Sequence, residues 1–184
     1  MELVEAVKTT EEVETVGRKL VLNARGNTLY SDIWHFGLQV ALRISDLLTV
    51  TMADALSGKL KIVEGKTGKT RVIPLNEKAL SIARRRATNH PDAIYLFQVN
   101  SNRAKDKPVS RVAVAQAFKA VGDELGIHLG THSMRKTRGW VMHNAGISIE
   151  MICKVLNHSS PAITMAYIGL TQGEMNATYD QFII

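Results

Sequence analysis

The chain has 184 residues, of which 45% are hydrophobic and 22% are charged. This length allows one well-packed domain but not two large ones, and the composition excludes intrinsically disordered and fibrous proteins. The net charge is +6, from 23 Lys and Arg against 17 Asp and Glu, which fits either a polyanionic partner or a merely solvated charged surface.

Helical patterning fills the first part of the chain. Thr9 and Glu12 have the spacing of a capping box and predict a helix that runs to about residue 25. The apolar segment 29–42 predicts a core helix. Ser45 and Asp46 are then expected to cap a further short helix that ends near residue 56.

A β-hairpin and more helices follow. Residues 59–75 alternate apolar and polar side chains around the glycine-containing turn EGKTGK, and so predict a hairpin with a basic tip. Further along we predict helices at 77–89, 110–125, 131–144, 148–156 and 162–168, a short strand at 93–98 and an exposed basic loop at 101–108. The predicted fold class is therefore mainly α with one small antiparallel β-sheet (α+β), in a single domain over residues 1–184.

The positive charge is concentrated in the middle of the chain. Residues 59–111 hold 13 basic and 4 acidic side chains, whereas residues 1–58 hold 5 and 8 and residues 112–184 hold 5 and 5. Clustered Lys and Arg neutralise phosphates and release counterions, so this segment indicates contact with a nucleic acid once other features agree.

Neither a membrane span nor a secretory leader is evident. No apolar run is long enough to cross a bilayer, and the opening MELVEAVK carries glutamates instead of a basic and apolar signal. We therefore expect a cytoplasmic, intracellular protein with no membrane partner. The single cysteine, Cys153, excludes an internal disulfide and is expected to be a buried apolar residue.

Three segments carry side chains suited to phosphate chemistry. The candidate residues are Arg43 and Asp46 in ALRISDLL, His132 and Arg135 in THSMRKTRGW, and His158 and Tyr167 in LNHSSPAITMAY. Residues three apart at a helix start share one face, so His132 and Arg135 can converge on one anion. Each segment alone is weak support, because His-x-x-Arg often occurs by chance and a lone tyrosine in a helix is usually a core or interface residue.

Taken in order, and with Lys66 on the hairpin turn, these segments resemble the catalytic domain of the tyrosine recombinase (phage integrase) family. The resemblance covers about residues 9–170. It departs at Val40-Ala41, where Thr-Gly is usual, and at Asn157, where glycine is usual. The N-terminal core-binding domain of most relatives is absent, so we expect either an excised fragment or a short recombinase.

The resemblance implies a division of catalytic roles. Tyr167 would attack a DNA phosphodiester to give a 3′-phosphotyrosyl bond, and Arg43 and Arg135 would hold the non-bridging oxygens. The other roles implied are Lys66 as general acid with Lys69 as its rival, His132 as the group that assists deprotonation of the tyrosine, His158 as a hydrogen-bond donor to the phosphate, and Asp46 as the partner of an arginine or histidine.

The implied chemistry needs neither cofactor nor metal, because arginines stabilise the transition-state charge. A zinc site at His132 and His158 is disfavoured, since the sequence has no compact cluster of ligand residues around them. Expected DNA contacts are Lys69, Arg71, Arg103, Lys105 and Lys107.

The partners implied are double-stranded DNA and further copies of the chain, as a tetramer on DNA. The tail 171–184 is expected to dock either on a neighbouring protomer or on its own chain, because its apolar end is costly to expose. The reaction would be integration, excision or inversion of DNA, as in mobile elements. Two alternatives remain: relaxation of DNA by a type IB topoisomerase-like enzyme, and a catalytically inactive DNA-binding regulator.

Overall fold

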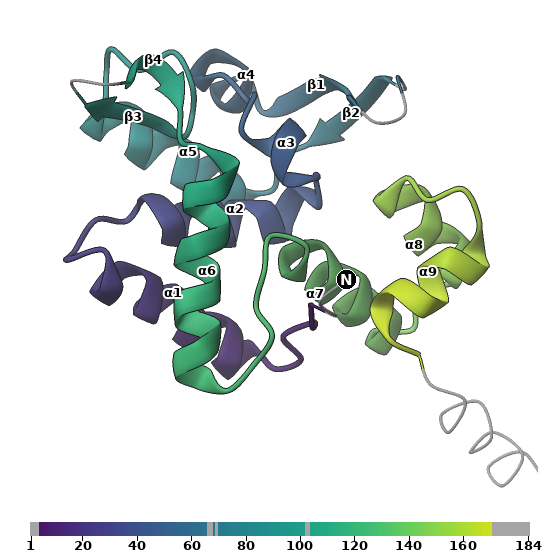
Figure 1. The fold of residues 1–184 in the computed structure, drawn as a ribbon. Helices are drawn as coiled ribbons and strands as arrows, with labels where there is room; N and C mark the ends of the chain where they lie inside the picture. The colour runs from purple at the N-terminus through teal and green to yellow at the C-terminus, as the bar shows by residue number, and fades with distance from the viewer. Residues whose placement is uncertain (1–3, 66–67, 69, 102–103, 171–184) are drawn as a thin grey trace, which may run out of the picture.

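The structure, a computed structural model, describes residues 4–65, 68, 70–101 and 104–170. In chain order the described elements are α1 (Thr10–Asn23), α2 (Leu29–Val40), α3 (Ile44–Leu47), α4 (Met52–Leu56), β1 (Lys59–Val63), β2 (Thr70–Pro74), α5 (Glu77–Asn89), β3 (Gln98–Ser101), β4 (Ala104–Pro108), α6 (Arg111–Leu125), α7 (Ser133–Asn144), α8 (Ile149–Leu156) and α9 (Pro161–Ile168). Figure 1 shows this arrangement, which confirms the mainly helical fold class. Within the described ranges no helix combines the length and apolar character needed to cross a membrane.

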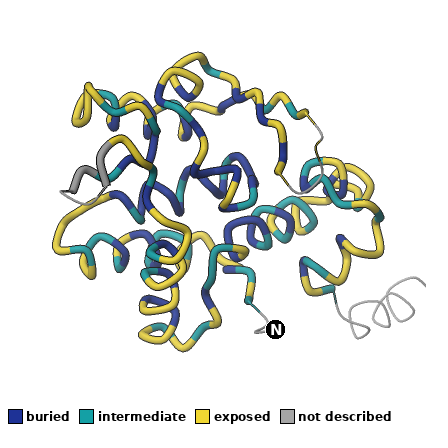
Figure 2. The backbone as a smooth tube through the Cα atoms, turned by 45° about the horizontal axis from the view of Figure 1, so that its top comes forward, coloured by how far each residue is buried: buried dark blue, intermediate teal, exposed yellow. Residues whose placement is uncertain are grey.

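Helix α2 is the centre of the main core. It packs against α1, α5, α6 and α7, which explains why its sequence is apolar on nearly every side. Trp34 and Phe36 are fully buried, and the Trp34 ring meets the Phe118 ring edge-on with centroids 5.7 Å apart. Figure 2 shows buried residues along the inward sides of the helices and exposed residues around the outside.

A second, smaller core joins the last three helices. Ile152, Leu156 and Ile168 are buried there together with Ala41 from the end of α2. Gly139 lets α7 and α9 approach closely, because a Cβ atom at this position would lie 2.7 Å from Ile168 Cγ2. Helices α8 and α9 therefore form one packed unit against α7, and Figure 1 shows this unit on the opposite side of the molecule from α1.

Most predicted helix starts are confirmed by their caps. Thr9 and Glu12 form the capping box of α1, with both side-chain to backbone distances at 3.1 Å. Ser110 and Ser148 cap α6 and α8, and Ser160 caps α9 with Pro161 at its first position. These signals are local in the chain, and tertiary packing did not override them.

The predicted hairpin at 59–75 is confirmed. Strands β1 and β2 are antiparallel, and Leu60 and Ile62 of β1 face inward while its odd-numbered residues are exposed. The expectation of a single sheet is wrong for the described residues, since β3 and β4 form a second hairpin. β3 begins only at Gln98, and β4 occupies most of the segment predicted to be a loop. Its polar sequence is typical of a loop, but strand pairing supplies its backbone hydrogen bonds.

Two predicted helix starts are wrong. Ser45 and Asp46 lie inside α3, whose first turn begins after Arg43, and the predicted helix breaks into α3 and α4. The break arises because the backbone around Thr51 pairs with residues near Tyr95 instead of continuing as a helix. At α7 the position before the helix is His132, not Thr131, and its side chain makes no cap.

Candidate active site

Arg43 stands where the chain leaves the central helix α2. Ala41 ends α2 in a left-handed conformation with φ of 50°, and Arg43 follows in an extended conformation as the residue before α3. The Arg43 side chain is 16% exposed, and its Nη1 atom donates a hydrogen bond and ion pair to Glu64. The turn from α2 to α3 thus leaves the Arg43 guanidinium partly exposed, with its Nη1 atom bound to the buried Glu64 carboxylate.

Arg135 lies on the first turn of α7 and is only 2% exposed. Its Nη1 donates to the Ala41 carbonyl at the end of α2, and its Nη2 donates to the Leu156 carbonyl at the end of α8 over 2.6 Å. Both carbonyls belong to helix C-termini, which lack partners within their own helix and carry partial negative charge. Burial lowers the pKa of Arg135, but a guanidinium remains a cation in proteins.

Tyr167 projects from α9 toward both arginines. Its hydroxyl oxygen lies 3.1 Å from Nδ1 of His132, and the Nζ atom of Lys136 lies 5.4 Å from its ring centroid. Burial raises the pKa of Tyr167, and the charges of Arg135 and Arg43, with a hydrogen bond from Arg135, oppose that rise. The structure therefore brings one phenol, two guanidiniums and an imidazole together from elements far apart in the sequence.

His158 also contacts the tyrosine and belongs to this cluster. Its ring packs edge-on against Tyr167 with centroids 4.8 Å apart, and its Nδ1 lies 3.0 Å from Thr164 Oγ1. Burial, together with the repulsion of a second positive charge by Arg135 and Arg43, lowers the pKa of His158 from 6.5 to about 4. At neutral pH the imidazole is therefore uncharged.

We expect His158 to remain neutral until the pH falls to about 4, as measured by NMR titration of its ring. Removing a nearby cation in Arg43→Ala should move this pKa upward. Between pH 6.5 and about 4 the unfolded chain binds this proton more readily than the folded chain does. The fold therefore loses stability as the pH falls through that window and keeps the full contribution above it. A His158 that titrates near 6.5 in the folded protein would contradict this.

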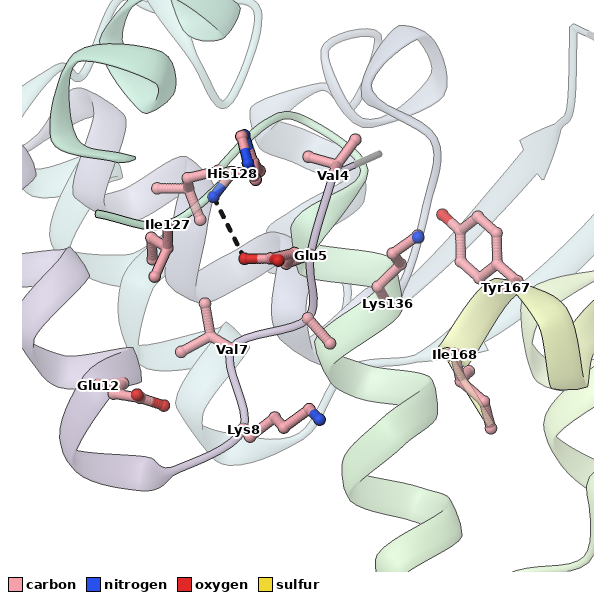
Figure 3. A pocket seen from close by; sticks show the side chains of 13 residues that line it. Val4, Glu5, Val7, Lys8, Glu12, Ile127, His128, Lys136, Tyr167 and Ile168 are labelled. Atoms are coloured by element: carbon pink, nitrogen blue, oxygen red, sulfur yellow. Dashed lines mark hydrogen bonds between the residues drawn. The ribbon is translucent and has the colours of Figure 1, made fainter. Parts of the chain in front are cut away.

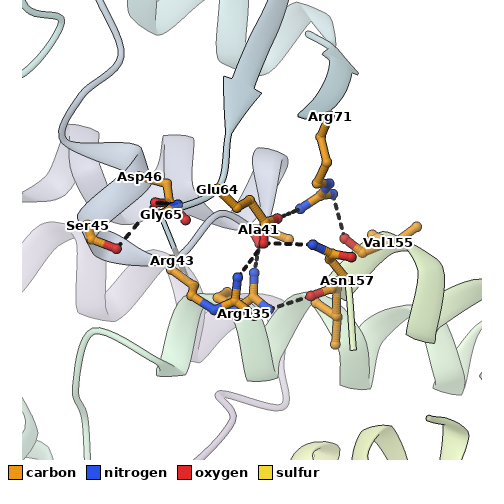
Figure 4. A network of polar contacts seen from close by, with 11 residues as sticks. Ala41, Arg43, Ser45, Asp46, Glu64, Gly65, Arg71, Arg135, Val155 and Asn157 are labelled. Atoms are coloured by element: carbon orange, nitrogen blue, oxygen red, sulfur yellow. Dashed lines mark hydrogen bonds and ion pairs between the residues drawn. The ribbon is translucent and has the colours of Figure 1, made fainter. Parts of the chain in front are cut away.

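Glu64 and Asn157 belong to the cluster but were not predicted from the sequence. Glu64 is fully buried and accepts hydrogen bonds from Arg43, from Arg71 Nη1 at 2.7 Å and from Asn157 Nδ2 at 2.7 Å (Figure 4). A signal for Glu64 was present, because it continues the inward-facing alternation of Leu60 and Ile62. A carboxylate on the buried face of a strand requires cationic or hydrogen-bonding partners.

Asp46 has a different partner from the one expected. Its Oδ1 accepts from the backbone amide of Gly65 at 3.2 Å, and within the described part of the chain its buried Oδ2 has no partner. Asp46 was expected to orient an arginine or histidine, and instead it holds the start of the turn between β1 and β2. Gly65 directly precedes Lys66, so this bond fixes the base of the segment that carries the expected general acid.

The structure describes only some of the expected DNA contacts, and it does not describe the expected general acid Lys66. Lys66, Lys69 and Arg103 lie outside the described residues, as does the tail 171–184. Lys107 is exposed on β4, and Lys105 belongs to the same strand. Arg71 is half-buried, with Nη1 on Glu64 and Nη2 on the Val155 carbonyl at 2.7 Å. The DNA roles of these residues remain predictions.

The N-terminal segment borders a cavity of about 390 Å³ beside the tyrosine. Figure 3 shows Lys136 and Tyr167 on one side and Glu5, Val7 and His128 on the other. The Glu5 amide donates to the His128 carbonyl at 2.9 Å, and the Val7 amide donates to Thr137 Oγ1 at 2.8 Å. Residues 4–8 therefore brace α7 and the loop that leads into it.

Comparison with known proteins gives consistent results. The sequence model of the "Phage integrase family" matches residues 21–174. The chain is 30% identical to "Probable integrase/recombinase YoeC" of Bacillus subtilis, over 99% of this chain and 98% of that protein. It is 31% identical to "Tyrosine recombinase XerA" of Pyrococcus horikoshii, over 71% of this chain but only 46% of that protein. The chain thus spans almost all of the first relative and about half of the second.

Solved structures show the same fold. A crystal structure of XerA recombinase superposes with a TM-score of 0.68 at 20% identity, covering 96% of this chain and 64% of that one. XerH site-specific recombinase bound to a difH substrate gives a TM-score of 0.72 at 13% identity, covering 95% and 52%. The family match over most of the sequence, together with the Bacillus relative that matches over nearly its whole length, settles the assignment: the chain belongs to the phage integrase family.

Proposed function

We propose that the chain is a site-specific DNA recombinase that cleaves and rejoins DNA strands through a 3′-phosphotyrosyl intermediate. The observation that carries this proposal is the convergence of Arg43, Arg135 and Tyr167 on one place, with the Tyr167 hydroxyl 3.1 Å from His132. Two guanidiniums beside a nucleophilic oxygen form a site for a phosphodiester.

In the proposed reaction the Tyr167 oxygen forms a bond to phosphorus as the bond to the 5′-oxygen breaks. The phenol proton leaves to His132 Nδ1, and Lys66 protonates the departing 5′-oxygen, with Lys69 as the alternative donor. One phosphodiester is exchanged for another, so no external energy source is required. The phenolate is a good leaving group for an alkoxide that attacks in the reverse step, because its pKa of about 10 lies far below that of an aliphatic alcohol.

The arginines and His158 would stabilise the charge that develops on the phosphate. Arg43 and Arg135 carry permanent charge in planar forks that match two non-bridging oxygens. His158 Nδ1 lies 3.0 Å from the Thr164 hydroxyl oxygen, and with hydrogen on Nε2 the imidazole would donate to the phosphate. These groups supply the electrostatic stabilisation that a metal ion supplies in many nucleases.

The partners we propose are double-stranded DNA and other copies of the chain. Structures with the same fold include "a lambda integrase dimer bound to a COC' core site" and "a lambda integrase tetramer bound to a Holliday junction". We propose a tetramer on paired DNA sites, with the tail 171–184 docking on a neighbouring protomer. The basic hairpin segments around β1–β2 and β3–β4 would approach the DNA backbone through Lys69, Arg71, Arg103, Lys105 and Lys107.

A covalent selection tests this function on many candidate DNA sites at once. The chain is incubated with a library of nicked duplexes of random sequence, the mixture is denatured, and protein-linked DNA is recovered and sequenced. A recombinase should enrich sequences with a shared inverted-repeat arrangement. Capture without enrichment, together with relaxation of supercoiled DNA, would indicate a topoisomerase, and DNA binding without capture would indicate an inactive regulator.

A further inference from the structure

Glu64 lies where four segments of the chain meet. Its carboxylate is fully buried and accepts from Arg43 before α3, from Arg71 on β2 and from Asn157 at the end of α8. Glu64 itself directly follows β1. Figure 4 shows the carboxylate between these side chains, with Arg135 below it. No other acidic side chain in the described part of the chain contacts Arg43.

The network holds Glu64 as an ion. Burial by itself would raise the pKa of Glu64, but hydrogen bonds from Arg71, Asn157 and Arg43 outweigh burial, and the pKa is lowered. A buried carboxylate that keeps its charge has a fixed position, because every movement away from its donors leaves a buried charge unpaired. Glu64 is therefore a rigid anchor and not a mobile surface acid.

The same network reaches the helix pair that carries Tyr167. Asn157 ends α8 in a left-handed conformation with φ of 50°, and its side chain returns to Glu64. Arg71 adds a second link, because its Nη2 donates to the Val155 carbonyl at 2.7 Å. His158 follows Asn157 directly, and α9 with Tyr167 packs against α8. The Arg43 side chain is thus tied through one carboxylate to the unit that presents the nucleophile.

We propose that Glu64 and Asn157 form a positioning pair that sets the Arg43 guanidinium relative to Tyr167. Glu64 holds the Nη1 edge of Arg43 and leaves the rest of the fork for the phosphate, while Asn157 fixes the distance between this fork and the α8–α9 unit. The inference rests on the proposed function, since it assigns Arg43 to the scissile phosphate. In the proposed arrangement both residues act on the phosphate through Arg43.

Two variants and one matched control test the pair. The quantity measured is the single-turnover rate at which the protein becomes covalently linked to a nicked duplex, with a DNA sequence taken from the covalent selection. Glu64→Gln should slow capture by about 10- to 100-fold, the loss typical when a group that orients an active-site ligand is removed. Asn157→Gly keeps the left-handed turn and removes only the amide, so it should slow capture by about tenfold. Glu77→Gln breaks an exposed ion pair with Arg84 at 2.8 Å and should change the rate by less than about twofold.

The double variant and a modified substrate separate positioning from a general structural defect. Glu64→Gln with Asn157→Gly should be about as slow as Glu64→Gln alone, because in the proposed pair the effect of the amide on Arg43 passes through the Glu64 carboxylate. The modified duplex carries a methyl group in place of one non-bridging oxygen of the scissile phosphate. Its transition state has less negative charge for Arg43 to stabilise. The penalty of Glu64→Gln should therefore shrink by about tenfold, whereas a structural defect would slow both substrates equally.

An NMR measurement tests the positioning of Arg43 without relying on DNA cleavage. The side-chain nitrogen signals of Arg43, identified by their loss in Arg43→Ala, should report a restrained guanidinium in the unaltered chain and faster rotation in Glu64→Gln and Asn157→Gly. If the unaltered chain captures no DNA, the proposed function fails. The NMR measurement then still tests whether Glu64 and Asn157 restrain the Arg43 guanidinium. Unchanged Arg43 signals would overturn the positioning pair, as would equal penalties on both substrates. Faster capture by Glu64→Gln would also overturn it, because the carboxylate would then compete with the phosphate.

Discussion

Tyr167→Phe is expected to abolish covalent capture of DNA while leaving DNA affinity within about twofold. The substitution removes one oxygen atom, the only atom of this side chain that can form an ester bond to phosphorus. The phenylalanine ring keeps the edge-on contact with His158, which has a centroid distance of 4.8 Å in the tyrosine. The hydrogen bonds with His132 at 3.1 Å and with Arg135 are lost, and the expected change in the free energy of unfolding is below about 3 kcal/mol.

The measurement combines denaturing gels for the covalent adduct with a filter-binding assay for affinity. Tyr30→Phe is the matched control, because Tyr30 lies at the start of α2 and packs against the main core. This control should capture DNA at the rate of the unaltered chain. Capture by Tyr167→Phe would show that another residue is the nucleophile, and the tail 171–184, which contains Tyr179, would be the next place to search.

The elements that could be predicted from the sequence are those whose signals are short-range. Caps such as Thr9 and Ser160 act within one helical turn, so the sequence alone locates the helix starts. Strands β3 and β4 were missed because a polar strand is stabilised by its neighbour's backbone, which leaves little trace in its own side chains. The split between α3 and α4 has the same origin, since residues near Tyr95 cause it.

The candidate site likewise contains residues that the sequence predicts and residues that it does not. Its six expected catalytic residues came from a family pattern, and those that the structure describes lie together. The pairing of Glu64 with Asn157 could not be predicted because the end of β1 meets the end of α8 only in three dimensions. In the sequence Asn157 stands out only as a departure from glycine. The structure shows that asparagine keeps the left-handed turn, with φ of 50°, and also adds an amide that glycine cannot supply.

Arg135 is both a proposed phosphate ligand and a structural link between helices, whereas Arg43 has no comparable backbone contacts within the described part of the chain. The Arg135 side chain satisfies the carbonyls of Ala41 and Leu156, which end α2 and α8. Those two contacts connect the end of α2, the central helix of the main core, to the end of α8 in the smaller core that contains Ala41, Leu156 and Ile168. Arg43 contacts a side chain instead and remains 16% exposed. The two arginines should therefore differ in stability effects even though both are proposed to bind the same phosphate.

Arg135→Ala is expected to lower the free energy of unfolding by about 2–5 kcal/mol, because two buried carbonyls lose their donor and a buried space is left. Arg43→Ala should cost less, since Glu64 keeps Arg71 and Asn157 as donors. Both variants should slow capture of DNA by about 100- to 1,000-fold or more, the cost of removing one donor to a transition-state oxyanion. Urea unfolding measures the first difference and single-turnover capture measures the second.

Arg135→Lys sharpens the comparison, because lysine keeps the positive charge but has a single nitrogen. One ammonium cannot span the Ala41 and Leu156 carbonyls with the geometry of a planar fork. We therefore expect Arg135→Lys to lose both stability and capture rate, in amounts closer to Arg135→Ala than to the unaltered chain. If Arg135→Lys were as stable as the unaltered chain, charge alone would hold α2 to α8. The shape of the guanidinium would then have no structural role at this junction.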